Sequence, residues 1–429
     1  MKYSIVIPTY NHCDDLLKPC IESILKYTNL HDIELIVVAN GCTDNTVYYL
    51  EYVASVFDMA GASDNFTWTG YKSPMGYAAA TNEGICNATC DKIILLNNDT
   101  VLLDQPKNKW LEMLDAPFQD PQCGISCIIK GHSEPAGRDF AVFFCVAVRK
   151  EVFDAIGLLN EEYGVGGGED TEFCIEAEKA GFKVTEVFEK AWDGIQFTGG
   201  FPIYHKGEGT MHDPELVPGW DNIFLRNSLK LAKKYNPEWY RWRLSNYWER
   251  AVFLKGDPVF PRETTRYQWA NQNLVGKKIL EIGCSDGYGI QFFPKDIEYT
   301  GVDYDPIIID VAKEQDWGYN AKFYNVDINK FELEQYDTII AFEVIEHIAN
   351  GLDVVGLLKQ HCKRLMITVP MNEPPGFWGP HHLLHGLNES HFPGAEYMYI
   401  NNAGDITSTP QEITQDNPCN LLLCMWTNG

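Results

Sequence analysis

Long apolar runs are missing from this chain of 429 residues, and so is an excess of positive charge. No run approaches the roughly 18–20 apolar residues that a membrane-spanning helix needs, which predicts that the chain has no transmembrane segment. Aspartate and glutamate outnumber lysine and arginine by 60 to 34, for a formal net charge of −26. Binding to a nucleic-acid backbone needs clustered Lys and Arg, so this charge argues against nucleic acid as the main partner.

A secretory leader and a disulfide framework are missing too. The chain starts with Met1 and Lys2, and the apolar segment that follows stops at Pro8, too early for a signal peptide. The 13 cysteines are odd in number and lack the spacing of a disulfide-rich scaffold. These features predict reduced thiols and a cytoplasmic protein.

Charge is distributed unevenly and divides the chain into three blocks. Residues 1–215 hold 15 basic and 33 acidic side chains, for a net charge of −18. Residues 216–262 hold nine basic and four acidic side chains (net +5), and residues 263–429 have a net charge of −13. The basic block is rich in aromatic residues and has helical spacing, with a helix start at Pro237. We predict two domains joined by this helical connector. It is either a plain link or an amphipathic surface that contacts an anionic membrane peripherally.

The first block alternates short apolar segments with amphipathic ones. We predict strands at 4–8, 34–38 and 92–96, and helices at 15–27 and 46–56. This alternation predicts an α/β fold with a mostly parallel sheet, whose ligands bind at the carboxyl ends of the strands. The longest apolar run, 140–148, is predicted as one buried strand.

Polar residues suited to metal binding follow one of these strands. Asn97, Asn98 and Asp99 come directly after the segment 92–96. Carboxylate and carbonyl oxygens bind hard divalent cations, which also bridge to phosphate oxygens. The alternative is an ordinary turn, because Asn and Asp favour turns.

A second acidic signature consists of glycines at 166–168 followed by Glu169 and Asp170. Acidic residues commonly cap helix starts, but three successive glycines suit a loop that closes on a ligand. A carboxylate there would act as a general base on an incoming hydroxyl. Further along, His205 is either another metal ligand or a structural histidine.

In their order along the chain, these segments resemble family 2 glycosyltransferases of the GT-A fold. The resemblance covers roughly residues 1–215 and rests on 4–11 (SIVIPTYN), 37–44 (VVANGCTD), 96–99 (LNND), 168–170 (GED) and His205. It implies an inverting transferase that uses a nucleotide-diphosphate sugar together with Mn²⁺ or Mg²⁺. A metal would neutralise the charge of the leaving diphosphate.

The resemblance also implies a role for each matching residue. The residues that would contact the nucleotide sugar are Pro8, Thr9, Tyr10, Asn40, Asp44, Asn97 and Asn98. Asp99 and His205 would ligate the metal, and Asp170 would be the acceptor base with Glu169 beside it. Ala39 stands where the family often has Asp, which leaves the nucleobase open.

The last block contains a glycine-rich turn after a predicted strand at 278–282. Gly283 and Gly287 lie in the turn, and Asp303 follows Gly283 by 20 residues. A dinucleotide fingerprint would need glycine at 285 and 288, where this chain has Ser285 and Tyr288, so the spacing argues against NAD. An acid at the end of the second strand can still bind ribose hydroxyls. The alternative is an ordinary strand–helix turn.

Further strands are predicted at 299–302, 323–327, 336–343, 364–370, 396–400 and 420–426. This order resembles class I methyltransferases that depend on S-adenosylmethionine (SAM), over roughly residues 263–429, and implies a Rossmann-like domain. The residues that would bind SAM are Glu281, Gly283, Ser285, Gly287, Asp303, Asp327 and Glu343. Ser285 departs from the commonest glycine, which a negative φ angle would accommodate.

Histidines gather in the last block. Methyl transfer to a hydroxyl benefits from a base and from positioning, so we predict His347 as catalytic and His381, His382 and His391 as acceptor-site residues. A zinc site made by these histidines is the alternative, although their spacing matches no standard site.

Both resemblances together predict a bifunctional glycan-modifying enzyme. It would transfer a sugar to a glycan or lipid-linked glycan and O-methylate a sugar. The alternative is a glycosyltransferase whose methyltransferase-like domain is a degenerate binding or structural module.

Overall fold

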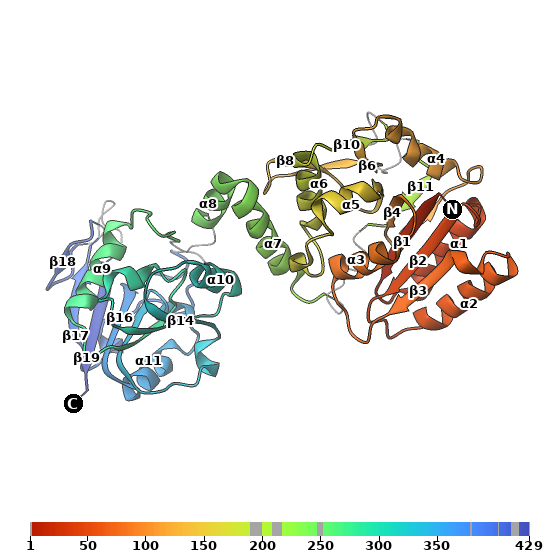
Figure 1. The fold of residues 1–429 in the computed structure, drawn as a ribbon. Helices are drawn as coiled ribbons and strands as arrows, with labels where there is room; N and C mark the ends of the chain where they lie inside the picture. Colours follow the sequence, from red (N-terminus) through yellow and green to blue (C-terminus); the bar gives the residue numbers. More distant parts are fainter. Residues whose placement is uncertain are drawn as a thin grey trace. The chain divides into compact units, whose positions relative to one another are not determined.

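The computed structural model of the chain describes residues 2–188, 200–207, 217–246, 252–377, 380–401, 403–412 and 420–428. It consists of two compact units, Met1–Trp242 and Arg243–Gly429, each with its own sheet and hydrophobic cores (Figure 1). Both are α/β units, as predicted. The predicted domain boundary at residue 215 lies outside the described residues. Within the described ranges, no helix is both long enough and apolar enough to cross a membrane.

The first unit is built on a seven-stranded sheet with the order β10-β6-β9-β4-β1-β2-β3. Its strands are β1 (Tyr3–Thr9), β2 (Ile33–Ala39), β3 (Phe66–Gly70), β4 (Lys92–Leu96), β6 (Cys123–Cys127), β9 (Cys145–Arg149) and β10 (Lys183–Glu186). β1 pairs in parallel with β2 and β4, whereas β9 runs antiparallel to β4 and β6. The predicted mostly parallel sheet is therefore present, with one antiparallel strand inside it.

Helices cover both faces of this sheet (Figure 1). These helices are α1 (Lys18–Tyr27), α2 (Thr46–Met59), α3 (Tyr77–Asn87), α4 (Lys109–Asp115), α5 (Lys150–Ile156) and α6 (Glu169–Lys179). Two further helices, α7 (Trp220–Tyr235) and α8 (Pro237–Ser245), follow them in the sequence. Side chains alternate along β1, so Ile5 packs in a core with α1 and α2, and Val6 packs in a second core with α3 and α6. Burial on both faces explains why apolar residues follow one another at Ile5, Val6 and Ile7 instead of alternating with polar ones.

The apolar run at 140–148 forms two strands, so the prediction of a single strand is wrong. β8 (Arg138–Ala141) pairs with β7 (Lys130–Ser133), whereas β9 belongs to the main sheet. Between them, the Phe144 N–H donates to the Val142 carbonyl (3.0 Å), which makes a tight turn. Neither Gly nor Pro marks this turn, so hydrophobicity alone could not reveal it.

The second unit is built on an eight-stranded sheet with the order β14-β13-β12-β15-β16-β19-β17-β18. The strands are β12 (Lys278–Ile282), β13 (Glu298–Asp303), β14 (Asn320–Asn325), β15 (Tyr336–Phe342), β16 (Cys362–Met371), β17 (Glu396–Ile400), β18 (Ile406–Thr407) and β19 (Asn420–Thr427). The strands from β12 to β16 pair in parallel, and β19 runs antiparallel to β16 and β17. The helices are α9 (Pro261–Gln272), α10 (Pro306–Glu314) and α11 (Gly351–Gln360).

The strand order of the second sheet reverses at β12. The chain continues from β12 to β13 and β14 on one side, and β15 and β16 lie on the other. Open α/β sheets bind ligands outside the carboxyl ends of their strands at such a switch point. The glycine turn at Gly283 therefore begins at the position where this fold places its ligand.

Candidate functional sites

The predicted metal ligands Asp99 and His205 meet in the first unit. Asp99 follows β4, and β11 (Ile203–His205) returns to it because β11 pairs antiparallel with β5 (Thr100–Leu102). Oδ1 of Asp99 lies 3.2 Å from Nε2 of His205, and the two side chains are only 9% and 12% exposed. The His205 ring also stacks on Phe144, with 4.4 Å between ring centroids. A carboxylate oxygen and an imidazole nitrogen held this close form a donor pair that fits a divalent cation.

Tyr77, the first residue of α3, joins this edge of the sheet, and our sequence analysis missed it. Its hydroxyl lies 3.2 Å from Oδ1 of Asn97 and 3.1 Å from the carbonyl of Phe143. Burial raises the pKa of Tyr77, and nearby carboxylates raise it further, those of Glu169, Asp170 and Asp99. Tyr77 therefore lies among the predicted acidic residues. Only its position after a glycine at a helix start could have pointed to it.

The glycine-rich loop places Glu169 and Asp170 at the start of α6. Its glycines at 166–168 have φ angles of 129°, 94° and 138°, which side-chain-bearing residues rarely adopt. A Cβ on Gly168 would also lie 2.6 Å from the ring of Tyr163. The glycine run is therefore required by the backbone path that presents the two carboxylates.

These two carboxylates differ in how they are held. Burial raises the pKa of both, and the charge of Asp170 adds to the rise at Glu169. Oδ1 of Asp170 accepts from the N–H (2.7 Å) and the hydroxyl (3.3 Å) of Thr171, whereas Oε2 of Glu169 is buried without a hydrogen-bond partner. Hydrogen bonds to a carboxylate favour its ionised form. Asp170 is thus the more readily ionised of the two, and a carboxylate must be ionised before it can accept a proton.

Other residues predicted to bind the nucleotide sugar lie at the ends of β1, β2 and β4. Nδ2 of Asn98 donates to Oγ1 of Thr9 (2.9 Å). Asn40 holds the loop before α3, because it donates to the Gly76 carbonyl (3.1 Å) and accepts from the Met75 N–H (2.7 Å). These contacts shape the strand ends, and their contact with a nucleotide stays a prediction.

Pro8 is buried, Tyr10 is half-buried, and Asp44 lies on the surface. The Asp44 carboxylate accepts from the N–H of Cys13 (2.8 Å) and from the hydroxyl of Thr46 (2.6 Å). Burial opposes its ionisation, but these hydrogen bonds outweigh burial and lower its pKa. Asp44 therefore ties the start of α2 to the turn before α1, and its role in a nucleotide pocket is untested.

Helix α7 of the predicted connector packs on the glycine-rich loop and lies within the first compact unit. Nδ2 of Asn227 donates to the carbonyls of Tyr163 (2.9 Å) and Gly166 (2.8 Å). Lys234 forms an ion pair with Glu172 of α6 (2.6 Å). The basic charge of this helix is thus partly directed at acidic side chains of its own unit.

In the second unit, the glycine turn after β12 has left-handed backbone angles. Gly283 has a φ of +68°, and a Cβ there would lie 2.7 Å from Val344 in the turn after β15. Ser285 has a φ of +51°, so it lacks the negative angle that would accommodate serine in place of the commonest glycine. The N–H of Ser285 donates to Oδ2 of Asp303 (3.1 Å), and this bond holds the serine in its unusual conformation. Gly287 also has a positive φ, of +78°.

Two acidic residues stand at the ends of the strands beside this turn. Asp303 ends β13 and is 3% exposed. Glu343 follows β15 with a φ of +53°, and its Oε1 is buried without a hydrogen-bond partner. Burial raises the pKa of Glu343, although the charges of Arg262 and Arg266 oppose the rise. A compact glycine turn between two strand-end acids fits a cofactor with a ribose diol and a cationic centre.

The other two predicted SAM ligands make contacts within the protein. Glu281, inside β12, accepts from the hydroxyls of Tyr267 and Tyr299, and burial raises its pKa to about 7. Asp327 is exposed and caps a short helical turn, where it accepts from the Asn329 N–H (2.9 Å). Their contact with a cofactor stays a prediction.

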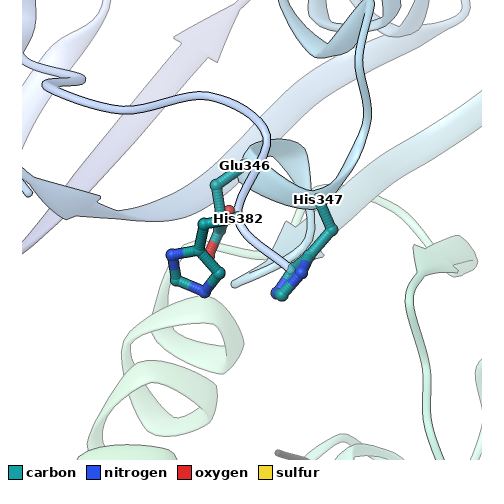
Figure 2. Close-up of side chains that lie close together, drawn as sticks. All are labelled: Glu346, His347 and His382. Carbon is teal, nitrogen blue, oxygen red and sulfur yellow. The ribbon is translucent and has the colours of Figure 1, made fainter. Parts of the chain in front are cut away.

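Three of the predicted histidines come together. The rings of His347 and His382 lie 4.6 Å apart at 87°, and Glu346 joins them (Figure 2). The carbonyl of His381 lies 3.2 Å from Nδ1 of His347. His391 instead caps the short helical turn that it ends, and within the described residues it is not part of this group.

These features define a GT-A-like unit with a paired acid and histidine, and a Rossmann-like unit with a glycine turn at its switch point. Comparison with protein families then identifies both. Residues 4–156 match the family model for glycosyl transferase family 2, and residues 280–366 match that for a methyltransferase domain. The two predicted resemblances are therefore confirmed, each over its own part of the chain, and they support transferase chemistry in both units.

Individual relatives are distant. The chain is 24% identical over 220 residues to the O-antigen biosynthesis protein RfbC of Myxococcus xanthus, which covers 43% of this chain and 16% of RfbC. It is 23% identical over 128 residues to the ubiquinone biosynthesis O-methyltransferase of Pseudomonas syringae pv. tomato, which covers 28% of this chain and 53% of that enzyme. Among solved structures it is similar to the mannosyltransferase PcManGT of Pyrobaculum calidifontis in complex with GDP-Man and Mn²⁺, with 17% identity and a TM-score of 0.37. The match covers 43% of this chain and 54% of the PcManGT chain. The chain spans less than two thirds of each of these proteins.

Proposed function

We propose that this chain is a bifunctional glycan-modifying enzyme. Its first unit would transfer a sugar from a nucleotide-diphosphate sugar to a hydroxyl of a glycan or lipid-linked glycan, with inversion. Its second unit would use SAM to methylate an oxygen of a sugar. The observation that carries the proposal is the 3.2 Å approach of Asp99 Oδ1 to His205 Nε2, since these ligand types are brought together from distant parts of the chain. The similarity to an O-antigen biosynthesis protein agrees with a glycan acceptor.

In the first unit, Asp99 and His205 would hold Mn²⁺ or Mg²⁺, and such an ion neutralises the charge of the leaving diphosphate. Asp170 would accept the proton of the acceptor hydroxyl. The acceptor oxygen then bonds to the anomeric carbon, the bond from that carbon to the diphosphate breaks, and its electron pair leaves with the diphosphate. One displacement from the opposite face inverts the configuration. Tyr77 would orient Asn97 beside the diphosphate through its hydroxyl.

In the second unit, the turn from Gly283 to Gly287 would pack against SAM, and Asp303 would accept from the ribose hydroxyls. SAM supplies a methyl group on a positively charged sulfur. The acceptor oxygen would bond to this methyl carbon, the carbon–sulfur bond would break, and its electron pair would stay on sulfur. The group around His347 would position the acceptor hydroxyl and assist the loss of its proton.

The two activities can be separated by point variants of the full chain. A thermal-shift screen of nucleotide sugars with Mn²⁺, and of SAM, first identifies the ligands, because a ligand that binds only the folded state raises the unfolding temperature. Asp170→Asn should then abolish sugar transfer and retain metal-dependent donor binding. Normal transfer by this variant would contradict the base assignment.

Asp303→Ala provides the matched test of the second unit. It should weaken SAM binding, measured by calorimetry, and leave sugar transfer unchanged. If the wild-type chain transfers sugar but does not bind SAM, the second unit is the degenerate module of the alternative prediction. Unchanged SAM affinity in the variant would refute the role of Asp303.

We also propose a cytoplasmic location, with peripheral membrane contact through residues 216–262. The exposed aromatic side chains of Phe224 (51%) and Trp242 (57%) support such a contact. Flotation with anionic vesicles tests it, and a chain that stays unbound would remove the membrane contact from the proposal.

A further inference from the structure

One cluster of metal-ligating side chains lies in the second unit, outside the turn assigned to SAM. Glu346 and His347 belong to the short helical turn Ile345–His347 after β15, and His382 lies in the loop after β16. Each residue offers a ligand atom, and these atoms all lie within 4.8 Å of one another. Figure 2 shows the three side chains gathered at this place from the two segments.

Glu346 makes this cluster unusual. The residue is 1% exposed, and both of its carboxylate oxygens are buried without a hydrogen-bond partner. An isolated buried carboxylate is costly, and buried charges in proteins are normally paired or bound to a metal. The backbone carbonyl of Glu346 accepts from the N–H groups of Leu383 (2.7 Å) and Leu384 (3.0 Å). These two bonds fix the loop that carries His382 against the turn that carries Glu346.

Both histidines are oriented by their Nδ1 atoms. Nδ1 of His347 lies 3.2 Å from the carbonyl oxygen of His381, and Nδ1 of His382 lies 2.5 Å from Oε2 of Glu373. A proton on each Nδ1 would serve these acceptors and leave the Nε2 lone pair to bind a ligand. Metal-binding histidines in proteins are held in this way, by a carboxylate or a backbone carbonyl behind the ring.

We propose that Glu346, His347 and His382 bind a divalent transition-metal ion of the Zn²⁺ type. Two imidazoles and one carboxylate are the donors of three-ligand zinc sites, which keep a further position open for water or substrate. Imidazole donors favour zinc over magnesium, which prefers oxygen ligands. Glu373 and the His381 carbonyl are positioning groups for the two rings.

The position of this cluster suggests its use, and this step rests on the proposed methyl transfer. Glu343, predicted to lie under the cofactor, precedes Glu346 by one short turn at the same strand end. An acceptor hydroxyl in the open coordination position would lose its proton to water more readily. Its oxygen would then bond to the methyl carbon as the carbon–sulfur bond breaks and sulfur keeps the electron pair. His347 would thus act as a ligand rather than as the base itself.

Metal binding can be measured without any substrate. The full chain is stripped with a chelator and titrated with Zn²⁺, and with Co²⁺, whose visible absorption bands report nitrogen and oxygen ligation. We expect one tightly bound ion that Glu346→Gln and His382→Ala weaken by at least about 100-fold, because each removes one of three ligands. Glu373→Gln should weaken it by about 10- to 100-fold, the usual effect of losing a group behind a ligand.

Three controls make the result specific. Glu396→Gln changes an exposed glutamate of β17 and should bind the ion like the wild type. Asp99→Asn alters the first unit and should retain this ion. Glu346→Gln is nearly isosteric and removes an unpartnered buried charge, so without metal it should unfold at the wild-type temperature or above, which separates lost binding from misfolding.

Two outcomes would overturn the inference. In the first, the only Zn²⁺ that the wild-type chain binds at micromolar concentration is an ion that Asp99→Asn no longer binds. In the second, Glu346→Gln and His382→Ala bind Zn²⁺ as tightly as the wild type. SAM binding without zinc binding would refute the metal site alone. Zinc binding without SAM binding would retain the metal site and refute the proposed methyl transfer.

Discussion

Replacement of Asn227 by alanine tests whether helix α7 supports the glycine-rich loop at 166–168, which we propose to be catalytic. Asn227 is 3% exposed, and its Nδ2 donates to the carbonyls of Tyr163 and Gly166 at 2.9 and 2.8 Å. Gly166 is the first glycine of the run that leads into Glu169 and Asp170, and Tyr163 precedes it by three residues. The substitution removes both hydrogen bonds without changing a residue that we assign to metal or substrate.

The size of the effect follows from these two bonds. Each hydrogen bond contributes about 0.5–1.5 kcal/mol to stability, so the loss should be about 1–3 kcal/mol. For a unit of this size, 1 kcal/mol shifts the unfolding temperature by about 2–4 °C, which predicts a decrease of about 2–12 °C. Because the loop also loses its support, kcat for sugar transfer should fall more than the affinity for the donor changes.

Calorimetry of unfolding and steady-state kinetics of sugar transfer check this prediction on the full chain. Asn222→Ala, an exposed position on the same helix, is the matched control and should change neither quantity. SAM binding should be the same in both variants. If Asn227→Ala unfolds at the wild-type temperature and transfers sugar at the wild-type rate, helix α7 does not support the loop and is only a connector.

Three further predictions concern single groups. Asp99→Ala should abolish the dependence of donor binding on Mn²⁺, measured by titration calorimetry, and an unchanged Mn²⁺ affinity would place the metal elsewhere. Since burial raises the pKa of Asp170, the acid limb of kcat/KM for sugar transfer should lie above the usual aspartate pKa of about 4, and a limb at or below this value would contradict its role as base. In the folded chain burial raises the pKa of Glu281 to about 7, whereas in the unfolded chain it is about 4.3. Protonated Glu281 therefore stabilises the fold fully below about pH 4.3, and this stabilisation is lost as the pH rises through 7. The second unit should therefore unfold at a lower temperature at pH 8 than at pH 6, and Glu281→Gln should reduce this difference; an equal difference in the variant would refute the assignment.

Local sequence patterns predicted the strand ends that carry the candidate sites. Asp99 and Asp303 each follow or end a buried apolar strand, and the glycines before Asp170 have no local explanation other than a special backbone path. Period-two and continuous apolar patterns report burial directly, which is why these elements were found.

Features that depend on tertiary contacts were not predicted. The resemblance predicted Asp99 and His205 as a pair, but the pairing of β11 with β5 that brings His205 to Asp99 has no signal in the sequence. Tyr77 joins the predicted site only through tertiary contacts, with Asn97 and with the carbonyl of Phe143. Ser285 adopts a positive φ because Asp303 accepts from its N–H, which overrides the residue's own backbone preference.

The central claim is that two separate ligand sites lie at the strand ends of the two units. Titration calorimetry of the full chain tests it most directly, with SAM in one experiment and a nucleoside diphosphate plus Mn²⁺ in another. We expect each ligand to bind once per chain. Asp303→Ala should weaken only SAM binding, and Asp99→Ala should abolish only metal-dependent nucleotide binding. A wild-type chain that binds neither ligand, or a single substitution that abolishes both, would contradict the account.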